Sequence, residues 1–143
     1  MNKKFLIIPI IISGFVLFGL SSGQTSEKNE PFFHVTLASP QQYQNGVYSS
    51  EFELIKGDYL FRFVPNGDSP KILSITLKGE NFEFTENFKL KGELHDTGIS
   101  EYYTWDYEGQ KLVHINSNQE VTIMIDPNEN LLGSVSVDLI ENQ

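Results

Sequence analysis

Aromatic side chains gather in the stretch from residue 101 to residue 107, which reads Glu-Tyr-Tyr-Thr-Trp-Asp-Tyr. Side chains of an extended strand point alternately to its two faces, so Tyr103, Trp105 and Tyr107 share one face. If that face is open to solvent, its flat rings suit stacking against the rings of a sugar. If the face is buried, the same rings supply apolar surface to a core. The pattern therefore predicts either a ligand platform or a core face.

Arg62 is the only arginine in the chain and lies within the stretch Gly-Asp-Tyr-Leu-Phe-Arg-Phe-Val-Pro-Asn-Gly at residues 57–67. Residues 59–64 are all apolar or aromatic except Arg62, which favours a strand at the centre of one sheet with both faces covered. A buried guanidinium needs a partner, because an unpaired buried charge is strongly destabilising. We therefore expect Arg62 either to form an ion pair or a cation–π contact, or to bind an anionic ligand.

Asp126, Asn128 and Asn130 place three oxygen-bearing side chains at alternate positions of one predicted loop. Calcium loops use similar spacing, because a hard cation needs several oxygens around one point. This stretch lacks the glycine and the distant glutamate of such loops, and Asp-Pro-Asn is a common turn sequence in its own right. The alternatives are a calcium site and a turn. We predict no other cofactor.

The remaining residue types argue against catalysis. The chain has no cysteine, which excludes thiol catalysis, disulfides and cysteine-ligated metals. His34, His95 and His114 have separations that match no local metal motif. The sequence also lacks a nucleophile-elbow pattern, a phosphate loop, a dinucleotide fingerprint and a zinc-protease motif. We therefore predict that the protein is not an enzyme.

The charge balance limits the partners. The formal net charge of the 143-residue chain is −9, from 19 acidic and 10 basic residues. Nucleic acids and anionic lipid surfaces attract clusters of lysine and arginine, so we expect neither as a partner. The acidic surface serves solubility, or attracts cations or basic proteins.

The first residues match the pattern of a secretory signal peptide. Lys3 and Lys4 precede a mostly apolar run at residues 5–20, and Ser21-Ser22-Gly23 offers small residues before a cleavage site. We expect residues 1–23 to be a signal peptide, 24–31 a disordered spacer and 32–143 the folded domain. The alternative is an uncleaved hydrophobic helix that anchors the chain in a membrane through residues 5–20. Either arrangement places the domain outside the cytoplasm, in a secreted or cell-surface protein.

Short alternating stretches separated by Gly, Pro, Asn or Asp turns occupy the rest of the chain. About nine strands are expected, with residues 82–85 and 88–94 as two separate ones, and no window shows an apolar stripe at helical spacing. Eight or nine strands exceed what one flat sheet usually holds. We predict an all-β, two-layer antiparallel β-sandwich, jelly-roll-like or immunoglobulin-like, preceded by the N-terminal hydrophobic helix.

These observations predict an exported, non-catalytic β-sandwich module that binds a glycan or a protein at the cell surface. The candidate ligand-binding residues are Tyr103, Trp105, Tyr107 and Arg62. The alternative is a structural or assembly component of an envelope complex, tethered by the N-terminal helix.

Overall fold

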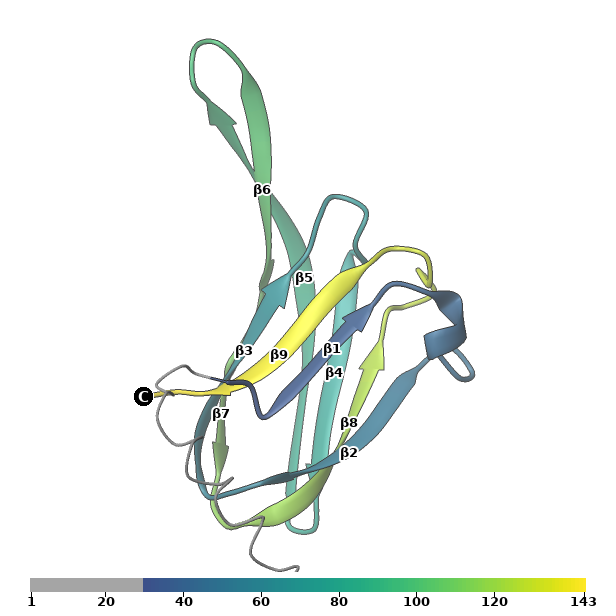
Figure 1. The fold of residues 1–143 in the computed structure, drawn as a ribbon, viewed down its shortest axis with the longest axis vertical. Coiled ribbons are helices and arrows are strands. Elements are labelled where there is room, and N and C mark those ends of the chain that lie inside the picture. The colour runs from purple at the N-terminus through teal and green to yellow at the C-terminus, as the bar shows by residue number, and fades with distance from the viewer. Residues whose placement is uncertain (1–29) are drawn as a thin grey trace, which may run out of the picture. The chain divides into compact units, whose positions relative to one another are not determined.

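Nine strands form the domain in the computed structural model, which describes residues 30–143 (Figure 1). The predicted signal peptide, the hydrophobic helix and most of the spacer fall on residues 1–29, outside the described part. Within the described part, no helix is long and apolar enough to span a membrane. The elements are β1 (Phe33–Leu37), a short 3-10 turn (Pro40–Gln42), β2 (Tyr48–Leu54), β3 (Gly57–Val64), β4 (Ile72–Gly79), β5 (Phe82–Asp96), β6 (Glu101–Glu108), β7 (Leu112–Ile115), β8 (Gln119–Asp126) and β9 (Val135–Glu141).

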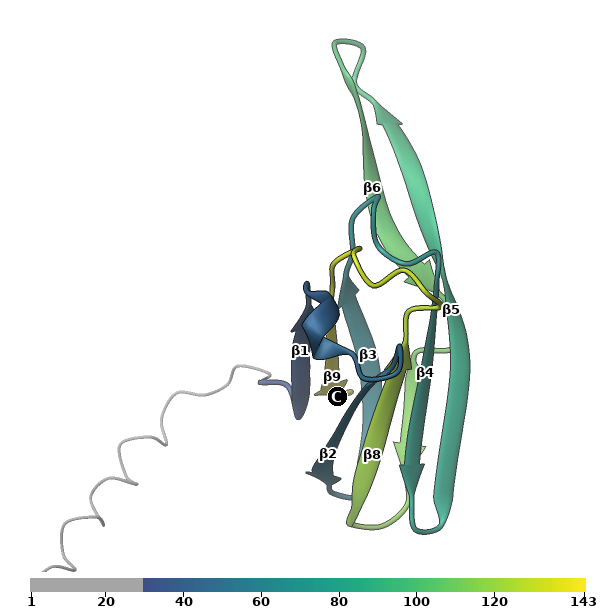
Figure 2. The ribbon, with the colours of Figure 1, turned by 90° about the vertical axis from the view of Figure 1, so that its right-hand side faces the viewer.

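The strands make two antiparallel sheets that face each other (Figure 2). One sheet has four strands in the order β1-β9-β3-β7, and the other has five in the order β2-β8-β4-β5-β6. The pairing is nested, because β1 pairs with β9, β2 with β8 and β3 with β7. The predicted all-β, two-layer antiparallel sandwich is confirmed.

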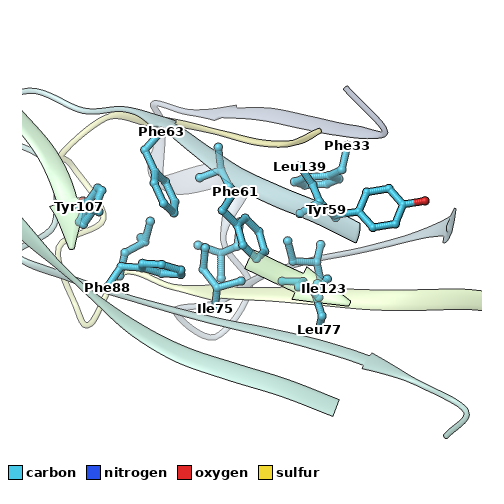
Figure 3. Close-up of a cluster of buried hydrophobic side chains, with 14 of the residues drawn as sticks. Phe33, Tyr59, Phe61, Phe63, Ile75, Leu77, Phe88, Tyr107, Ile123 and Leu139 are labelled. Carbon is cyan, nitrogen blue, oxygen red and sulfur yellow. The ribbon is translucent and has the colours of Figure 1, made fainter. Parts of the chain in front are cut away.

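The core lies between the sheets and is built from every second residue of each strand, as the period of two predicts. Tyr59, Phe61 and Phe63 of β3 are buried and face the five-stranded sheet (Figure 3). The Phe63 ring lies 4.9 Å from that of Phe88 on β5 and 5.1 Å from that of Tyr107 on β6, measured between centroids. Aliphatic side chains of β4, β8 and β9 fill the space around these rings, among them Leu73, Ile75, Leu77, Ile123, Ile125, Val137 and Leu139.

The strand β3 is central in its sheet, as predicted, but only one of its faces is covered. Arg62 and Val64 point outward and are exposed, and Leu60 is half-buried. In the described part of the chain no third layer packs on this face. Leu60 instead lies in a row with Leu112 of β7 and Ile140 of β9, which are its register partners. The apolar outer positions therefore reflect cross-strand contact, not a second core.

The residues expected to form two strands, 82–85 and 88–94, belong to one strand of 15 residues, β5. The polar pair between them does not break it, because Glu86 and Asn87 both find partners in the extended conformation. The Asn87 amide oxygen accepts a hydrogen bond from the Ser74 hydroxyl at 2.6 Å, and the Glu86 carboxylate accepts one from the backbone N–H of Gln110. The far end of β5 pairs with β6 beyond the sandwich, and the two strands project as a hairpin (Figures 1 and 2). We call residues 92–105 the arm.

Candidate functional site

The apolar inner face of the five-stranded sheet continues onto the arm. Opposite residues of β5 and β6 share a face, and Leu90 with Tyr107 forms the last inner pair within the sandwich. The next pairs on that face are Gly92 with Trp105 and Leu94 with Tyr103. The four-stranded sheet does not extend this far (Figure 2). Side chains patterned for a core therefore become accessible at the base of the arm.

The three rings predicted to form one row, those of Tyr103, Trp105 and Tyr107, differ in their exposure to solvent. Tyr107 is 1% exposed, and its hydroxyl donates a hydrogen bond of 2.6 Å to the Pro70 carbonyl oxygen. Burial raises its pKa far above the ordinary tyrosine value. Tyr103 is exposed and Trp105 is half-buried, and their rings stack at 5.6 Å. Tyr107 therefore belongs to the core, and a solvent-facing platform of all three rings is not formed.

Two glycines set the position of the Trp105 ring. A Cβ atom at Gly92, its cross-strand neighbour, would lie 2.6 Å from Trp105 Cζ3, and one at Gly67 would lie 3.1 Å from Trp105 Cζ2. The ring therefore lies over the Gly92 backbone and beside the β3–β4 loop. Aromatic packing over a cross-strand glycine is a known device for holding sheet register. Trp105 thus has a structural role as well as an accessible part.

Two hollows meet at Trp105. One has a volume of about 440 Å³ and is lined by Arg62, Phe63 and Leu60, among others, and the second has a volume of about 610 Å³ and is lined by Lys91, Glu93 and Thr104, among others. Trp105, Asp106 and Lys111 line both.

The two hollows connect residues that the sequence suggested separately. Arg62 and Trp105, both predicted ligand-binding residues, line the same 440 Å³ hollow although they are far apart in the chain. Asp106 and Lys111 were not predicted. Their charged ends pair at 2.9 Å. The Lys111 ammonium also lies 5.9 Å from the centre of the Phe63 ring. Only the fold reveals these neighbours.

Arg62 forms an ion pair on the outer face of the four-stranded sheet. Its Nη2 donates to Asp138 Oδ2 at 2.7 Å and its Nε donates to the same oxygen at 3.2 Å. His34 Nδ1 contacts the other carboxylate oxygen. The expected ion pair is confirmed, but the expected burial of the guanidinium is wrong, because the Arg62 side chain is half-exposed. An anionic ligand for Arg62 stays a prediction.

The buried member of this cluster is Asp138, whose side chain is 11% exposed. Burial by itself would raise the pKa of its carboxyl group. Hydrogen bonds from His34 and Arg62, and the charges of these residues, outweigh that effect and lower the pKa below the ordinary value. The carboxylate therefore stays ionised and links β1, β9 and β3.

Sequence spacing did not reveal that each histidine has a neighbour across a strand. His114 Nδ1 lies 2.6 Å from Asp58 Oδ1, and the His95 ring stacks on Tyr102 at 4.9 Å. The cross-strand neighbour of His34 is Asp138 on β9. The strand register would have predicted these pairs, because each joins register partners on adjacent strands.

The side chains of the predicted calcium loop make hydrogen bonds within the loop and to its neighbours. Asp126 Oδ1 accepts from the backbone N–H of Asn128 at 2.8 Å, and Asn130 Oδ1 accepts from the backbone N–H of Gly133 at 2.9 Å. The Asn128 amide nitrogen donates to the Ile72 carbonyl oxygen at 2.8 Å. Among residues 30–143, no group of three or more His, Asp or Glu side chains is arranged to hold a metal ion. The contacts support the turn alternative, and the calcium site stays a prediction.

The chain has no significant match among protein-family models, curated proteins or solved structures.

Proposed function

We propose that the protein is an exported, non-catalytic module that binds a glycan at the base of the arm. The observation that carries this proposal is the convergence of Arg62 and Trp105 on one hollow. An indole ring offers a flat apolar face to the C–H groups of a sugar ring. Charged and hydroxyl groups beside it bind the sugar hydroxyls.

The lining of the two hollows contains both kinds of group. Asp106 and Glu93 accept hydrogen bonds, Lys111 donates them, and the Thr104 hydroxyl does both. Volumes of about 440 and 610 Å³ lie within the range of small-molecule sites. A site of one or two sugar units is therefore consistent with the space and the chemistry.

The nested strand pairing supports a jelly-roll-like arrangement over an immunoglobulin-like one. In a jelly roll, the first strand pairs with the last and the following strands pair inward in the same manner, which is the order seen here with β6 added at one edge. Lectin domains are among the proteins that use this architecture. That point is an analogy of fold, and the proposal depends on the site.

Intrinsic fluorescence tests the proposal directly, because Trp105 is the only tryptophan in the chain. The full-length protein is titrated with a panel of neutral and uronic-acid-containing oligosaccharides while the indole emission is followed. We expect at least one oligosaccharide class to shift the emission saturably. Trp105→Ala and Lys111→Met should weaken binding at least tenfold, as measured by calorimetry.

Tyr102→Ala is the matched control, since it removes an exposed ring of β6 that lines neither hollow. It should leave glycan affinity unchanged. If no oligosaccharide binds, or if the Trp105 and Lys111 variants bind as well as the wild type, the glycan proposal is wrong.

A second candidate is an assembly component of an envelope complex. It is favoured by the exposed apolar side chains farther out on the arm, which lie away from the hollows. Tethering depends on residues 1–23, so intact-mass analysis of the native protein separates the two candidates. Retention of these residues supports a tethered component, and their removal supports a released module.

A further inference from the structure

The outer part of the arm exposes apolar side chains within a short segment. Ile99 is 95% exposed at the tip, and Leu94, Tyr102 and Tyr103 are each about half exposed. Single exposed apolar residues are ordinary, but a group of four on a two-stranded projection is not. This part of the arm is therefore suited to contact with another surface.

The strand β6 also has an open edge, because it is the last strand of its sheet. The backbone N–H of Tyr107 donates to the side-chain oxygen Oδ1 of Asp106 at 2.8 Å. The backbone N–H of Leu90, the register partner of Tyr107, points away from β6 and donates to the Lys71 carbonyl oxygen at 2.9 Å. The Leu90–Tyr107 pair therefore does not exchange ladder bonds. By the alternation of an antiparallel ladder, the backbone groups of Tyr103 and Trp105 also point to the open edge.

Charge determines which strand fits that edge. Between residues 92 and 106 the acidic residues are Glu93, Asp96, Glu101 and Asp106, and there is no lysine or arginine. Only Asp106 has an ion-pair partner among the described residues, Lys111. Pairing β6 with β6 of a second copy would bring together two acidic segments that have no lysine or arginine between residues 92 and 106 to offset their charge. The edge therefore favours a basic strand from a different protein.

We infer that the open edge of β6 binds an extended segment of a partner protein by strand addition. The segment carries apolar residues at alternate positions, next to Tyr103 and Trp105 on the inner face, and lysine or arginine between them. In this mode of recognition the main-chain hydrogen bonds supply affinity, and the alternate side chains supply specificity. The inference does not depend on glycan binding, which uses the hollows at the base.

Synthetic peptides test the inference in the full-length protein. The probe is a fluorescein-labelled octapeptide of alternating valine and lysine, and binding is followed by fluorescence anisotropy. Two matched peptides carry N-methyl groups on every second amide, one on the valines and one on the lysines. We expect one methylated peptide to lose at least tenfold in affinity and the other to keep it, because only one set of amides faces β6. A peptide of alternating valine and glutamate should not bind.

Variants locate the site. Tyr103→Pro removes an edge N–H, which edge strands tolerate, and Tyr103→Lys places a cation at the edge without changing the backbone. Both should weaken binding of the valine–lysine peptide at least tenfold. Leu132→Ser is the control, since Leu132 is exposed and lies outside the arm. Equal affinity for all the lysine peptides, or for the wild type and both Tyr103 variants, would overturn the inference.

Discussion

Asp138 is the only buried acidic residue in the described part of the chain. Each of its carboxylate oxygens has a cationic or potentially cationic partner, Arg62 on one side and His34 on the other. Partners of this kind offset the loss of hydration that burial causes. Asp138 lies on β9, Arg62 on β3 and His34 on β1. Their contacts therefore stabilise the pairing of these three strands in the four-stranded sheet.

Replacing Asp138 with asparagine should change how stability depends on pH. The folded-state pKa of Asp138 is lowered, so its contribution is fully present above the ordinary aspartate pKa of about 3.9 and disappears as the pH falls through the folded value. We expect Asp138→Asn to be less stable than the wild type at pH 7 by about 2 kcal/mol. The difference should shrink below about pH 4.

Urea unfolding between pH 2 and pH 7 measures this difference. Glu129→Gln, at an exposed residue, is the control and should follow the wild-type curve. A constant difference between Asp138→Asn and the wild type across the whole range would contradict the assignment.

The sequence predicts which residues of a strand share a face far better than it predicts their partners. The alternation of Tyr59, Phe61 and Phe63 was sufficient to place them on one buried face. The partner of Arg62 is 76 residues away, and it depends on the register between β3 and β9. No local pattern carries that information.

At the scale of elements, the arm is the feature that sequence reasoning missed. The residues 82–85 and 88–94 each alternate, and the polar residues between them resemble a turn. The partners of Glu86 and Asn87, which make the extended conformation favourable, come from other strands. The sequence predicted the aromatic residues of β6. Which of them lie in the core depends on where the opposite sheet ends.

The contact between Gly92 and Trp105 predicts the effect of a small change in the arm. A Cβ atom at residue 92 would lie 2.6 Å from the ring, so Gly92→Ala forces the indole to move. We expect a shift of the tryptophan emission maximum, a changed near-ultraviolet circular dichroism signal and a loss of about 1 kcal/mol in stability. Lys91→Ala, one residue away on the outer face, should leave the emission unchanged. An unaltered spectrum in Gly92→Ala would show that the ring is not held against the glycine.

At the scale of the whole molecule, the sandwich and the arm are separable. The described core cluster consists of residues on the sandwich and includes no residue from 92–105. Replacing residues 94–103 with Asn-Gly leaves Glu93 and Thr104, which by the alternation of the ladder are a hydrogen-bonded pair, at the ends of a two-residue hairpin turn, for which that dipeptide is favoured. We expect the shortened protein to melt within a few degrees of the wild type, as measured by calorimetry.

The shortened protein also separates the two binding proposals. It should keep glycan binding, because the residues named at the hollows remain (Arg62, Glu93, Thr104, Trp105, Asp106 and Lys111). It should lose binding of the valine–lysine peptide, because Tyr103 and most of the open edge are removed. Unfolding of this variant would show that the arm supports the sandwich. Loss of both activities from a folded variant would show that they share one site.

The fold class could be predicted from the number of strands and the spacing of turns in the sequence. The order of the strands within each sheet could not. Alternation shows that a segment is a half-buried strand, but five of the seven strand pairings in the two sheets join segments distant in sequence. The position of the candidate site depends on that order, because β3 supplies Arg62 and β6 supplies Trp105.

The nested pairing also has a consequence for how the chain folds. The last strand, β9, lies between β1 and β3, so the four-stranded sheet has no continuous centre until residues 135–141 are available. The neighbouring strands β4, β5 and β6 need only short loops to pair, and long-range closure is slow because its entropic cost precedes its contacts. We therefore expect β4–β6 to form first. A chain that emerges N-terminus first, from a ribosome or a membrane channel, cannot complete the four-stranded sheet until residues 135–141 have emerged.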